Sequence, residues 1–571
     1  MSANICFNLT NIIRNQLKLS WNFNIIDTFF KLIDLSLLFG TILLSTIIIL
    51  FVIKYDKELR LKFKIKKELP KEDGSFEYGS SRWASNKEIK NHFKVWNIGN
   101  KIKCGGIPVT FIGNNCYYDD STDHTLIVGS TGSGKTISTI MPLVFNLASA
   151  GESMVINDTK GELYSTTANY LKELGYNIRI INLRDALASD GWNPLHLPYK
   201  YFKSGDIDEA GDMIENFAKS LTKNLSSKDM YWEKSANAVL TALCYALIED
   251  APCEEQVNLY SIYNLLVEHG AKTIDRFNSL DLYFQQKPFG NISKNAYATG
   301  SFAKGETRAT LFSVIATVIK MFSDIGIANM TSRTDFELEE IGQTKTAVFL
   351  IIPDEKESRH DLASLFIHQC YQANVYVAQT LSNGRLPIRV NFILDEFANM
   401  PPIPSMSNKI TVSRSRNMRF YLVLQDFDQL KETYKESAGT IKSNCTNWIY
   451  LLTADNETAK EISTRLGKYT ISSNRISTST RLEQLDYNLS NDKSLIGRDL
   501  MMSDELMRFK FGEALFLKAR MHPIKSTYLS IEKYGFKIKQ AKLPSESREY
   551  EIACFNLDEF RKKKNEDLLD L

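Results

Sequence analysis

The segment Gly129–Thr136 reads GSTGSGKT and matches the complete nucleotide-binding P-loop pattern. A β-branched run, Thr125–Val128, precedes it, and an apolar segment that can form a helix, Ile137–Ala148, follows it. The sequence therefore predicts a strand, a loop and a helix in that order, which is the context the pattern requires. A glycine-rich turn without a ligand is the alternative, and the complete pattern with these flanks argues against it.

This loop has the residue types that hold a triphosphate. Glycines let its backbone N–H groups point at phosphate oxygens, and the helix start adds the positive end of its dipole. Lys135 is expected to reach the β- and γ-phosphates, and the Thr136 hydroxyl to hold Mg²⁺. The sequence thus predicts a site for ATP and Mg²⁺. The predicted nucleotide-binding residues are Gly129, Ser130, Thr131, Gly132, Ser133, Gly134, Lys135 and Thr136.

The bulk properties limit the other classes of function. A chain of 571 residues is too long for one core, so two or three domains are expected. A net charge of +2 makes no case for nucleic acid by itself, so any basic surface must be local. The eight cysteines are scattered without a C-x-x-C pair, which favours free thiols in a reducing compartment and gives no zinc-ligand spacing. No metal is predicted beyond nucleotide-bound Mg²⁺.

An uncharged apolar run, Leu35–Ile53, predicts a transmembrane helix. Its nineteen residues would span about 28 Å, enough to cross a hydrocarbon core. A buried core helix rarely runs this long without a polar face, and a cleaved signal peptide does not suit the thirty-four residues that precede it.

The flanks of this run predict its orientation. Residues 54–71 carry eight Lys or Arg, against three in residues 1–34, so the positive-inside rule places the chain after Ile53 in the cytoplasm. Residues 21–34 are partly apolar but are interrupted by charges, which favours an interfacial helix over a second span. A two-span hairpin stays open.

Several later segments resemble buried parallel strands, and helical patterns such as His360–Leu381 and Glu457–Leu466 separate some of them. These features predict a doubly wound α/β sheet, whose ligands lie beyond the carboxyl ends of the strands. The predicted strands, besides the one before the P-loop, are Met154–Ile156, Ile178–Ile181, Ala347–Ile352, Asn391–Leu394, Phe420–Leu424 and Trp448–Leu452.

Three of these strand ends carry polar chemistry. The run Val390–Leu394 delivers Asp395 and Glu396, and an ATPase needs such a pair to complete the Mg²⁺ shell and to polarise the attacking water. Gln425 follows another strand and is suited to sensing the γ-phosphate or positioning water; a local turn is its alternative. The polar turn Asn157–Glu162 is expected beside the nucleotide pocket.

Arg414, Arg416 and Arg419 lie just before the strand that ends at Gln425. One of them would reach a neighbouring subunit's nucleotide as an arginine finger, or contact DNA phosphates, or only solvate a loop. The sequence does not decide among these roles.

The P-loop and the acidic pair lie far apart in the chain. Lys135 and Asp395 are 260 residues apart, more than a compact P-loop core requires. The excess falls at residues 196–334, which show helical periodicity and little strand character, and we therefore predict an inserted all-α domain there. Its helical segments are Ile207–Lys223, Tyr231–Ile248, Leu259–Glu268 and Thr310–Met321.

Together these features resemble the type IV coupling proteins of the TraG/TraD type, from about Tyr78 to Tyr528. These proteins are hexameric membrane ATPases that bring substrates to conjugation and type IV secretion channels. The P-loop alone does not single out this family; LDEFAN preceded by NDTKGEL and WNPL in this order is more specific. The segments that carry the resemblance are Gly79–Ala84, Gly129–Thr136, Asn157–Leu163, Trp192–Leu195, Tyr231–Trp232, Leu394–Asn399 and Leu424–Gln425.

The resemblance implies a RecA-like P-loop NTPase motor with an inserted all-α domain and an N-terminal transmembrane anchor. It also implies a homo-hexamer around a channel, with Asp395 and Glu396 as the Walker B pair and Gln425 as a third-motif residue. Family anchors often have two spans, whereas only one is clear here. The expected regions are an N-terminal tail with an interfacial helix or weak first span (1–34), a transmembrane helix (35–53), a basic juxtamembrane linker leading into the motor (54–110), a first motor segment (111–195), the all-α domain (196–334), a second motor segment (335–558) and a charged C-terminal tail (559–571).

The resemblance therefore predicts a membrane-anchored ATPase, with its bulk in the cytoplasm, that drives single-stranded DNA with its relaxase to a type IV secretion channel. One alternative is a double-stranded DNA pump of the FtsK or HerA type, which NDTKGEL, WNPL and the helical insertion argue against. Another is a non-hydrolysing membrane receptor for cargo, which the complete P-loop and acidic pair argue against. Whether the cargo is DNA, protein or both stays open, as do the relaxase and channel partners.

Overall fold

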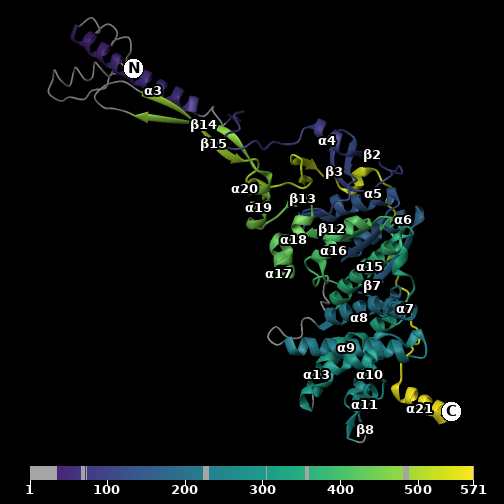
Figure 1. Cartoon of the computed structure of the whole chain (residues 1–571). Coiled ribbons are helices and arrows are strands. Elements are labelled where there is room, and N and C mark those ends of the chain that lie inside the picture. The colour runs from purple at the N-terminus through teal and green to yellow at the C-terminus, as the bar shows by residue number, and fades with distance from the viewer. Residues whose placement is uncertain are drawn as a thin grey trace. The chain divides into compact units, whose positions relative to one another are not determined.

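The computed structural model describes residues 35–65, 71–72, 74–222, 230–274, 276–303, 305–353, 359–479 and 488–569. The chain divides into two compact units (Figure 1). The first comprises Met1–Ser80 and Lys468–Arg498, and the second comprises Ser81–Gly467 and Asp499–Leu571. The predicted N-terminal tail, with its interfacial helix or weak first span, lies outside the described residues.

The first unit contains the helix that includes the predicted membrane span. Helix α3, Leu35–Ile65, continues beyond Ile53 into the basic segment. This unit also holds a three-stranded sheet in the order β1–β14–β15, formed by Lys71–Glu72, Lys468–Ser479 and Asn488–Asp499. Within the described part of the chain, no single helix is both long and apolar enough to cross a membrane; one helix pair, Glu306–Ser323 with Ile325–Thr331, meets the criteria together but is bent by 84°. The transmembrane span stays a prediction.

The second unit is built on a nine-stranded sheet in the order β17-β16-β13-β5-β12-β11-β6-β10-β7. The seven strands from β13 to β7 are parallel, whereas β16 and β17 join the edge in antiparallel pairs. All the strands that the sequence predicted are present and parallel. The strands are β5 (Thr125–Gly129), β6 (Ser153–Asp158), β7 (Asn177–Asn182), β10 (Thr346–Ile351), β11 (Val390–Leu394), β12 (Met418–Leu424), β13 (Asn447–Leu452), β16 (Glu513–Lys518) and β17 (Ile524–Thr527).

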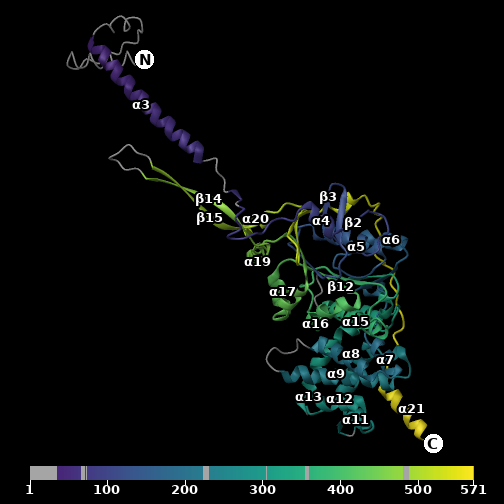
Figure 2. The same ribbon diagram turned by 45° about the horizontal axis from the view of Figure 1, so that its top comes forward.

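Helices cover both faces of this sheet, which explains why its central strands read as continuous apolar runs. Ile127 of β5 points into the core beneath α5 (Met141–Ala150) and α6 (Glu162–Glu173), whereas Leu126 and Val128 point into the core on the other face. Figure 2 shows β12 between α5 and α6 on one side and α15 and α16 on the other. The helices of this second face are α15 (His360–Thr380), α16 (Met406–Val412), α17 (Phe427–Tyr434), α18 (Ser437–Asn444) and α19 (Asn456–Leu466).

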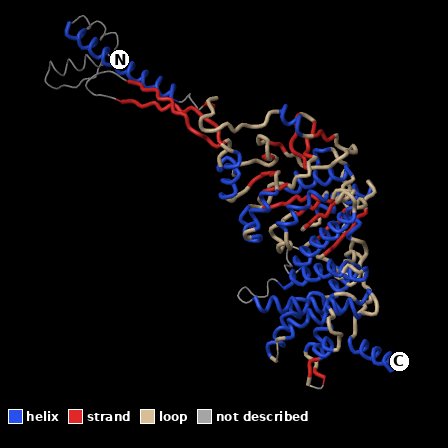
Figure 3. The backbone as a smooth tube through the Cα atoms, viewed as in Figure 1, coloured by secondary structure: helices blue, strands red, loops and turns tan. Residues whose placement is uncertain are grey.

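Between β7 and β10 the chain is almost wholly helical (Figure 3). The four helices that periodicity predicted here are present; they are α8, α9, α10 and α13. One hairpin, formed by two strands of two residues each, interrupts the helices of this segment. The helices are α7 (His196–Ser204), α8 (Ile207–Thr222), α9 (Met230–Asp250), α10 (Leu259–Gly270), α11 (Ser279–Gln285), α12 (Ile292–Ser301), α13 (Glu306–Ile319) and α14 (Ile325–Thr331), and the hairpin strands are β8 (Thr273–Ile274) and β9 (Phe277–Asn278).

The helical segment leaves and rejoins the sheet at one place. The backbone N–H of Trp192 donates to the Met330 carbonyl at 2.9 Å, and that of Asp335 donates to the Gly191 carbonyl at 3.1 Å. Strands β7 and β10, which flank the segment, are neighbours in the sheet. Its buried side chains continue into the core of the α15 face. That residues 196–334 form a separate inserted domain therefore stays a prediction.

Two regions that the sequence assigned to a linker and a tail have regular structure. Helix α4 (Asn86–His92) and a sheet in the order β2–β4–β3 (Lys94–Trp96, Asn115–Asp119 and Ile107–Ile112) occupy much of the stretch before residue 120. Helix α21, Leu557–Leu569, occupies the charged C-terminal end, where Arg561 donates to the Ser279 carbonyl at 2.9 Å. Helix α20, Ser503–Leu506, precedes β16.

Candidate nucleotide-binding site

The P-loop joins strand β5 to the helix that follows it, as predicted. Gly132 and Gly134 have φ values of 79° and 86°, in the left-handed region that favours glycine. A Cβ on Gly129 would lie 2.5 Å from the Ser133 hydroxyl oxygen and 3.0 Å from the Lys135 Cγ, so a larger residue here would displace both side chains. That buried hydroxyl has no hydrogen-bond partner among the described residues. A wrapped glycine-rich loop of this kind, with its backbone N–H groups available, fits a phosphate group.

The helix after the loop opens with a π-helical turn, Thr136–Ile140, in which the Met141 N–H bonds to the Thr136 carbonyl. Such turns are rare and occur frequently at functional sites. The sequence predicted a helix from Ile137 but gave no sign of this widened turn.

Lys135 and Thr136 face the acidic pair at the end of β11. The Lys135 Nζ donates to the carbonyls of Gly129 and Ser130, and the Thr136 Oγ1 lies 3.4 Å from the Asp395 Oδ2. Burial lowers the pKa of Lys135, although the negative charges of Asp395 and Glu396 act to raise it. A hydroxyl and a carboxylate at one point are the oxygen ligands that Mg²⁺ takes in nucleotide sites. The residues present therefore fit nucleotide and Mg²⁺.

Glu396 has a conformation that is uncommon for its residue type. Its φ of 53° lies in the left-handed region, and its carboxylate accepts a hydrogen bond from the Asn399 Nδ2 at 3.0 Å. The Asn157 side chain donates to the Asp395 carbonyl at 2.6 Å and so ties the end of β6 to the end of β11. Backbone strain of this kind costs about 1–3 kcal/mol and concentrates at functional sites.

The polar turn after β6 lies at the same edge, as predicted. The Asp158 carboxylate accepts the backbone N–H groups of Gly161 at 2.9 Å and Tyr164 at 2.8 Å, which fixes the start of α6. Burial raises the pKa of Asp158 in spite of these hydrogen bonds. This turn forms one wall of the site.

Most of the P-loop, the turn after β6 and the acidic pair line a hollow of about 250 Å³. Gly129 and Ser133, which the sequence also predicted to bind the nucleotide, do not line it. Phe511, which no motif in the sequence marks, also lines it. The lining residues are Ser130, Thr131, Gly132, Gly134, Lys135, Thr136, Ile137, Asp158, Thr159, Lys160, Glu162, Asp395, Glu396 and Phe511. In the described part of the chain, no group of three or more His, Cys, Asp or Glu could hold another metal ion.

Gln425 directly follows β12, which lies between the P-loop strand and β11 in the sheet. It therefore lies at the carboxyl edge, as predicted, but it does not line the hollow. Its role in sensing the γ-phosphate or positioning water stays a prediction.

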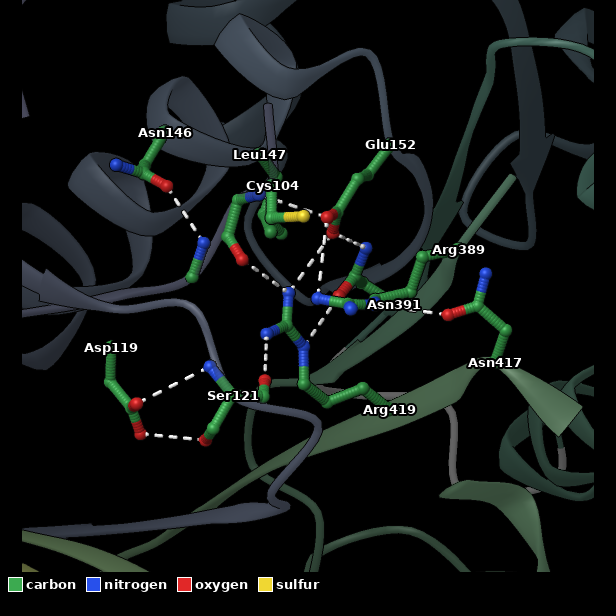
Figure 4. A network of polar contacts seen from close by, with 12 residues as sticks. Cys104, Asp119, Ser121, Asn146, Leu147, Glu152, Arg389, Asn391, Asn417 and Arg419 are labelled. Atoms are coloured by element: carbon green, nitrogen blue, oxygen red, sulfur yellow. Dashed lines mark hydrogen bonds and ion pairs between the residues drawn. The ribbon is translucent and has the colours of Figure 1, made fainter. Parts of the chain in front are cut away.

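Arg419 is buried and is therefore not available as an arginine finger or as a DNA contact. Its side chain is 1% exposed, and its guanidinium donates to the Asn391 Oδ1 at 2.9 Å, the Ser121 carbonyl at 2.7 Å, the Gly105 carbonyl at 3.1 Å and the Glu152 Oε2 at 3.0 Å (Figure 4). An arginine that is buried and makes four hydrogen bonds inside the fold reaches neither DNA nor a neighbouring nucleotide. The prediction was wrong for Arg419.

The other two arginines lie on a short 3₁₀ turn, Ser413–Arg416, at the amino edge of the sheet. This edge is opposite the P-loop, so neither arginine belongs to the nucleotide site of its own chain. Arg414, 44% exposed, pairs with Asp123 at 2.9 Å. A contact of Arg414 or Arg416 with a neighbouring subunit or with DNA stays a prediction.

The buried acid at the site makes stability depend on pH. Burial, and then the charge of Glu396, raise the pKa of Asp395 to about 6 from its ordinary 3.8. Between these pH values the folded protein holds a proton that the unfolded chain has lost. The free energy of unfolding therefore falls as the pH rises through this window, and it stays lower above pH 6.

Asp395→Asn removes this buried charge, so the variant is expected to be more stable than the wild type at pH 7, by on the order of 3 kcal/mol. The difference should shrink as the pH falls toward about 4. Urea unfolding without nucleotide, measured across this range for both proteins, tests the expectation. Equal stabilities at pH 7 would contradict it.

Known proteins share both the sequence pattern and the fold. The sequence model of the family described as "Type IV secretory system Conjugative DNA transfer" matches residues 82–548. The conjugal transfer protein TraG of Escherichia coli is 25% identical over 476 residues, covering 76% of this chain and 71% of TraG. The protein VirD4 of Rhizobium rhizogenes is 23% identical over 423 residues, covering 72% of this chain and 59% of VirD4.

Two solved structures of the plasmid coupling protein TrwB are similar to this chain in fold. The complex with the non-hydrolysable ATP analogue ADPNP has a TM-score of 0.57 at 16% identity, covering 84% of this chain and 99% of TrwB. The complex with ADP and Mg²⁺ has a TM-score of 0.56 at 16% identity, covering 81% and 97%. At such identities the likeness is one of fold.

Proposed function

Because the chain belongs to the type IV secretory system family of conjugative DNA transfer proteins, we propose that it is a membrane-anchored ATPase that drives single-stranded DNA with its relaxase to a type IV secretion channel. The observation that carries the proposal is that the Thr136 Oγ1 lies 3.4 Å from the Asp395 Oδ2, in a hollow that Lys135 and Glu396 also line. This brings together a phosphate-binding loop and an acidic pair that are far apart in the sequence.

Each residue of the site has a distinct role in this proposal. The P-loop backbone and Lys135 hold the phosphates, and Thr136 and Asp395 hold Mg²⁺. Bound Mg²⁺ supplies positive charge that offsets the charge of the phosphates. Glu396 orients the attacking water and accepts its proton. TrwB, which is similar in fold, has been solved in complex with ADPNP and with ADP and Mg²⁺, and these complexes support nucleotide and Mg²⁺ binding by this chain.

The remaining regions complete the assembly that we propose. Helix α3 anchors the chain in the cell membrane by its apolar half, and the second unit lies in the cytoplasm. Six copies surround a channel, and the helices of residues 196–334 receive the relaxase and its DNA. Gln425 senses the γ-phosphate, and Arg414 or Arg416 acts on a neighbouring copy or on the DNA backbone.

The choice of DNA strand tests the transfer proposal. ATP hydrolysis by the purified full-length protein is expected to rise more with single-stranded DNA than with the same sequence as a duplex. Greater stimulation by the duplex would favour a double-stranded DNA pump. No hydrolysis in the presence of either DNA would favour a receptor that only recruits cargo.

A further inference from the structure

Phe511 is an exposed aromatic side chain on the rim of the nucleotide hollow. It lies in the turn between α20 and β16, and 65% of its surface is exposed. A Cβ on Gly134 would lie 2.5 Å from the Phe511 Cε2 and 3.2 Å from its Cδ2 and Cζ. The ring therefore lies directly over the P-loop backbone, and Gly134 leaves room for it.

The turn that carries Phe511 is held in place on both sides. The Glu513 N–H donates to the Lys510 carbonyl at 2.9 Å, and the Glu513 carboxylate accepts the Lys510 N–H at 2.9 Å. The Tyr528 N–H donates to the Gly512 carbonyl at 2.8 Å, and Gly512 has a φ of 89°. The ring is thus presented to solvent by an ordered turn, and packing inside the fold does not account for its position.

The chemistry of the hollow separates into a charged region and an apolar rim. Lys135, Lys160 and the acidic residues supply its charges, whereas Phe511 is the aromatic residue among the described residues that line it, and Ile137 is its other large apolar side chain. At about 250 Å³ the hollow is smaller than the roughly 300–1,000 Å³ of pockets that enclose a whole small ligand. A triphosphate suits its charged region, and the apolar rim is suited to the uncharged remainder of the ligand.

We propose that the nucleobase of the bound nucleotide stacks on the Phe511 ring. This inference rests on the proposed function, since it requires that the P-loop binds a nucleotide. Stacking buries an exposed ring against a flat heterocycle and tolerates any base, because every base has a π-face. Phe511 therefore contributes affinity for the nucleoside portion of the ligand without strong selection between adenine and guanine.

Equilibrium binding to the full-length protein tests this role without reference to hydrolysis. The probes are ATP, GTP and inorganic tripolyphosphate, each with Mg²⁺, and the variants are Phe511→Ala and Phe511→Trp. Phe511→Ala is expected to weaken ATP and GTP binding by roughly 5- to 150-fold and to leave tripolyphosphate binding unchanged. Phe511→Trp should restore both nucleotides.

A control variant and the tripolyphosphate probe distinguish base stacking from a role of the ring in supporting the loop. Phe289→Ala removes another exposed phenylalanine, far from the site in sequence and absent from its lining, and should change no affinity. Equal losses for tripolyphosphate and ATP in Phe511→Ala would show that the ring only supports the loop, and would overturn the inference. Unchanged ATP binding in Phe511→Ala would also overturn it.

A neighbouring hollow of about 580 Å³ offers the base a different position, because it shares Ile137, Lys160 and Glu162 with the nucleotide site and is lined by Leu543. ATP binding that is weakened by Leu543→Ala and not by Phe511→Ala would place the base there. If the wild type binds none of the three probes, the nucleotide site is rejected, and with it the proposed function. The two failures are therefore distinguishable.

Discussion

Glu396→Gln is expected to bind ATP as the wild type does and to hydrolyse it about 10²- to 10⁴-fold more slowly, the usual contribution of a positioned general base. An amide cannot accept the proton of the attacking water. It can still accept the hydrogen bond of the Asn399 side chain, which lies 3.0 Å from the Glu396 carboxylate. The backbone of the site should therefore be preserved.

Four measurements on this variant separate its effects. ATP affinity should match the wild type, and the unfolding temperature should not fall, because the charge of Glu396 opposes the ionisation of Asp395. Hydrolysis in vitro should slow by about 10²- to 10⁴-fold, and plasmid transfer from donor cells should be lost. Asn399→Ala is the matched control, because it removes the partner of the carboxylate and keeps the base, and it should retain much more hydrolysis. Normal hydrolysis or transfer by Glu396→Gln would reject Glu396 as the base.

Arg419→Met is expected to destabilise the second unit by about 3–5 kcal/mol, the usual cost of removing one partner of a buried ion pair. Methionine is of similar length but leaves Glu152, which is 8% exposed, with Arg389 at 3.4 Å as its remaining cation. The carbonyls of Gly105 and Ser121 also lose their donors (Figure 4). Arg419→Lys should recover little, because an ammonium cannot reproduce the planar fork of donors.

The midpoint of urea unfolding measures this loss, and Arg414→Met supplies the control. Arg414 is on the same stretch of chain, but its ion pair with Asp123 is partly exposed, and such pairs contribute about 0–1 kcal/mol. An Arg419→Met protein with normal stability and a specific loss of DNA-stimulated hydrolysis would restore Arg419 as a functional arginine. Wild-type stability with normal hydrolysis would reject the structural role as well.

The sequence predicted the centre of the site because its motifs are local. A P-loop is defined by contiguous residues, and the apolar strand before Asp395 and Glu396 is equally short-range. Parallel strands place their carboxyl ends at one edge, so the strand assignments alone brought Asn157 and Asp395 to the P-loop. These predictions required no knowledge of long-range packing.

The features that the sequence did not reveal depend on contacts between distant segments. Nothing near Phe511 marks it as a neighbour of Gly134, since their proximity arises from the addition of β16 beside β13. Arg419 precedes an apolar run and so resembled a loop residue. A signal was present, because Asn391 is also polar, is the second residue of its strand and pairs with Arg419 in register. Polar residues at matched positions of neighbouring buried strands indicate a buried network.

The joint between the helical segment and the sheet has an evolutionary consequence. Its two ends are hydrogen-bonded to each other at Gly191–Trp192 and Met330–Asp335, and they enter neighbouring strands. Chain ends that lie this close allow a segment to be lengthened, shortened or exchanged without shifting the strands on either side. Under the proposed function, selection for a new cargo can thus act on the helices while the geometry of ATP hydrolysis is inherited unchanged.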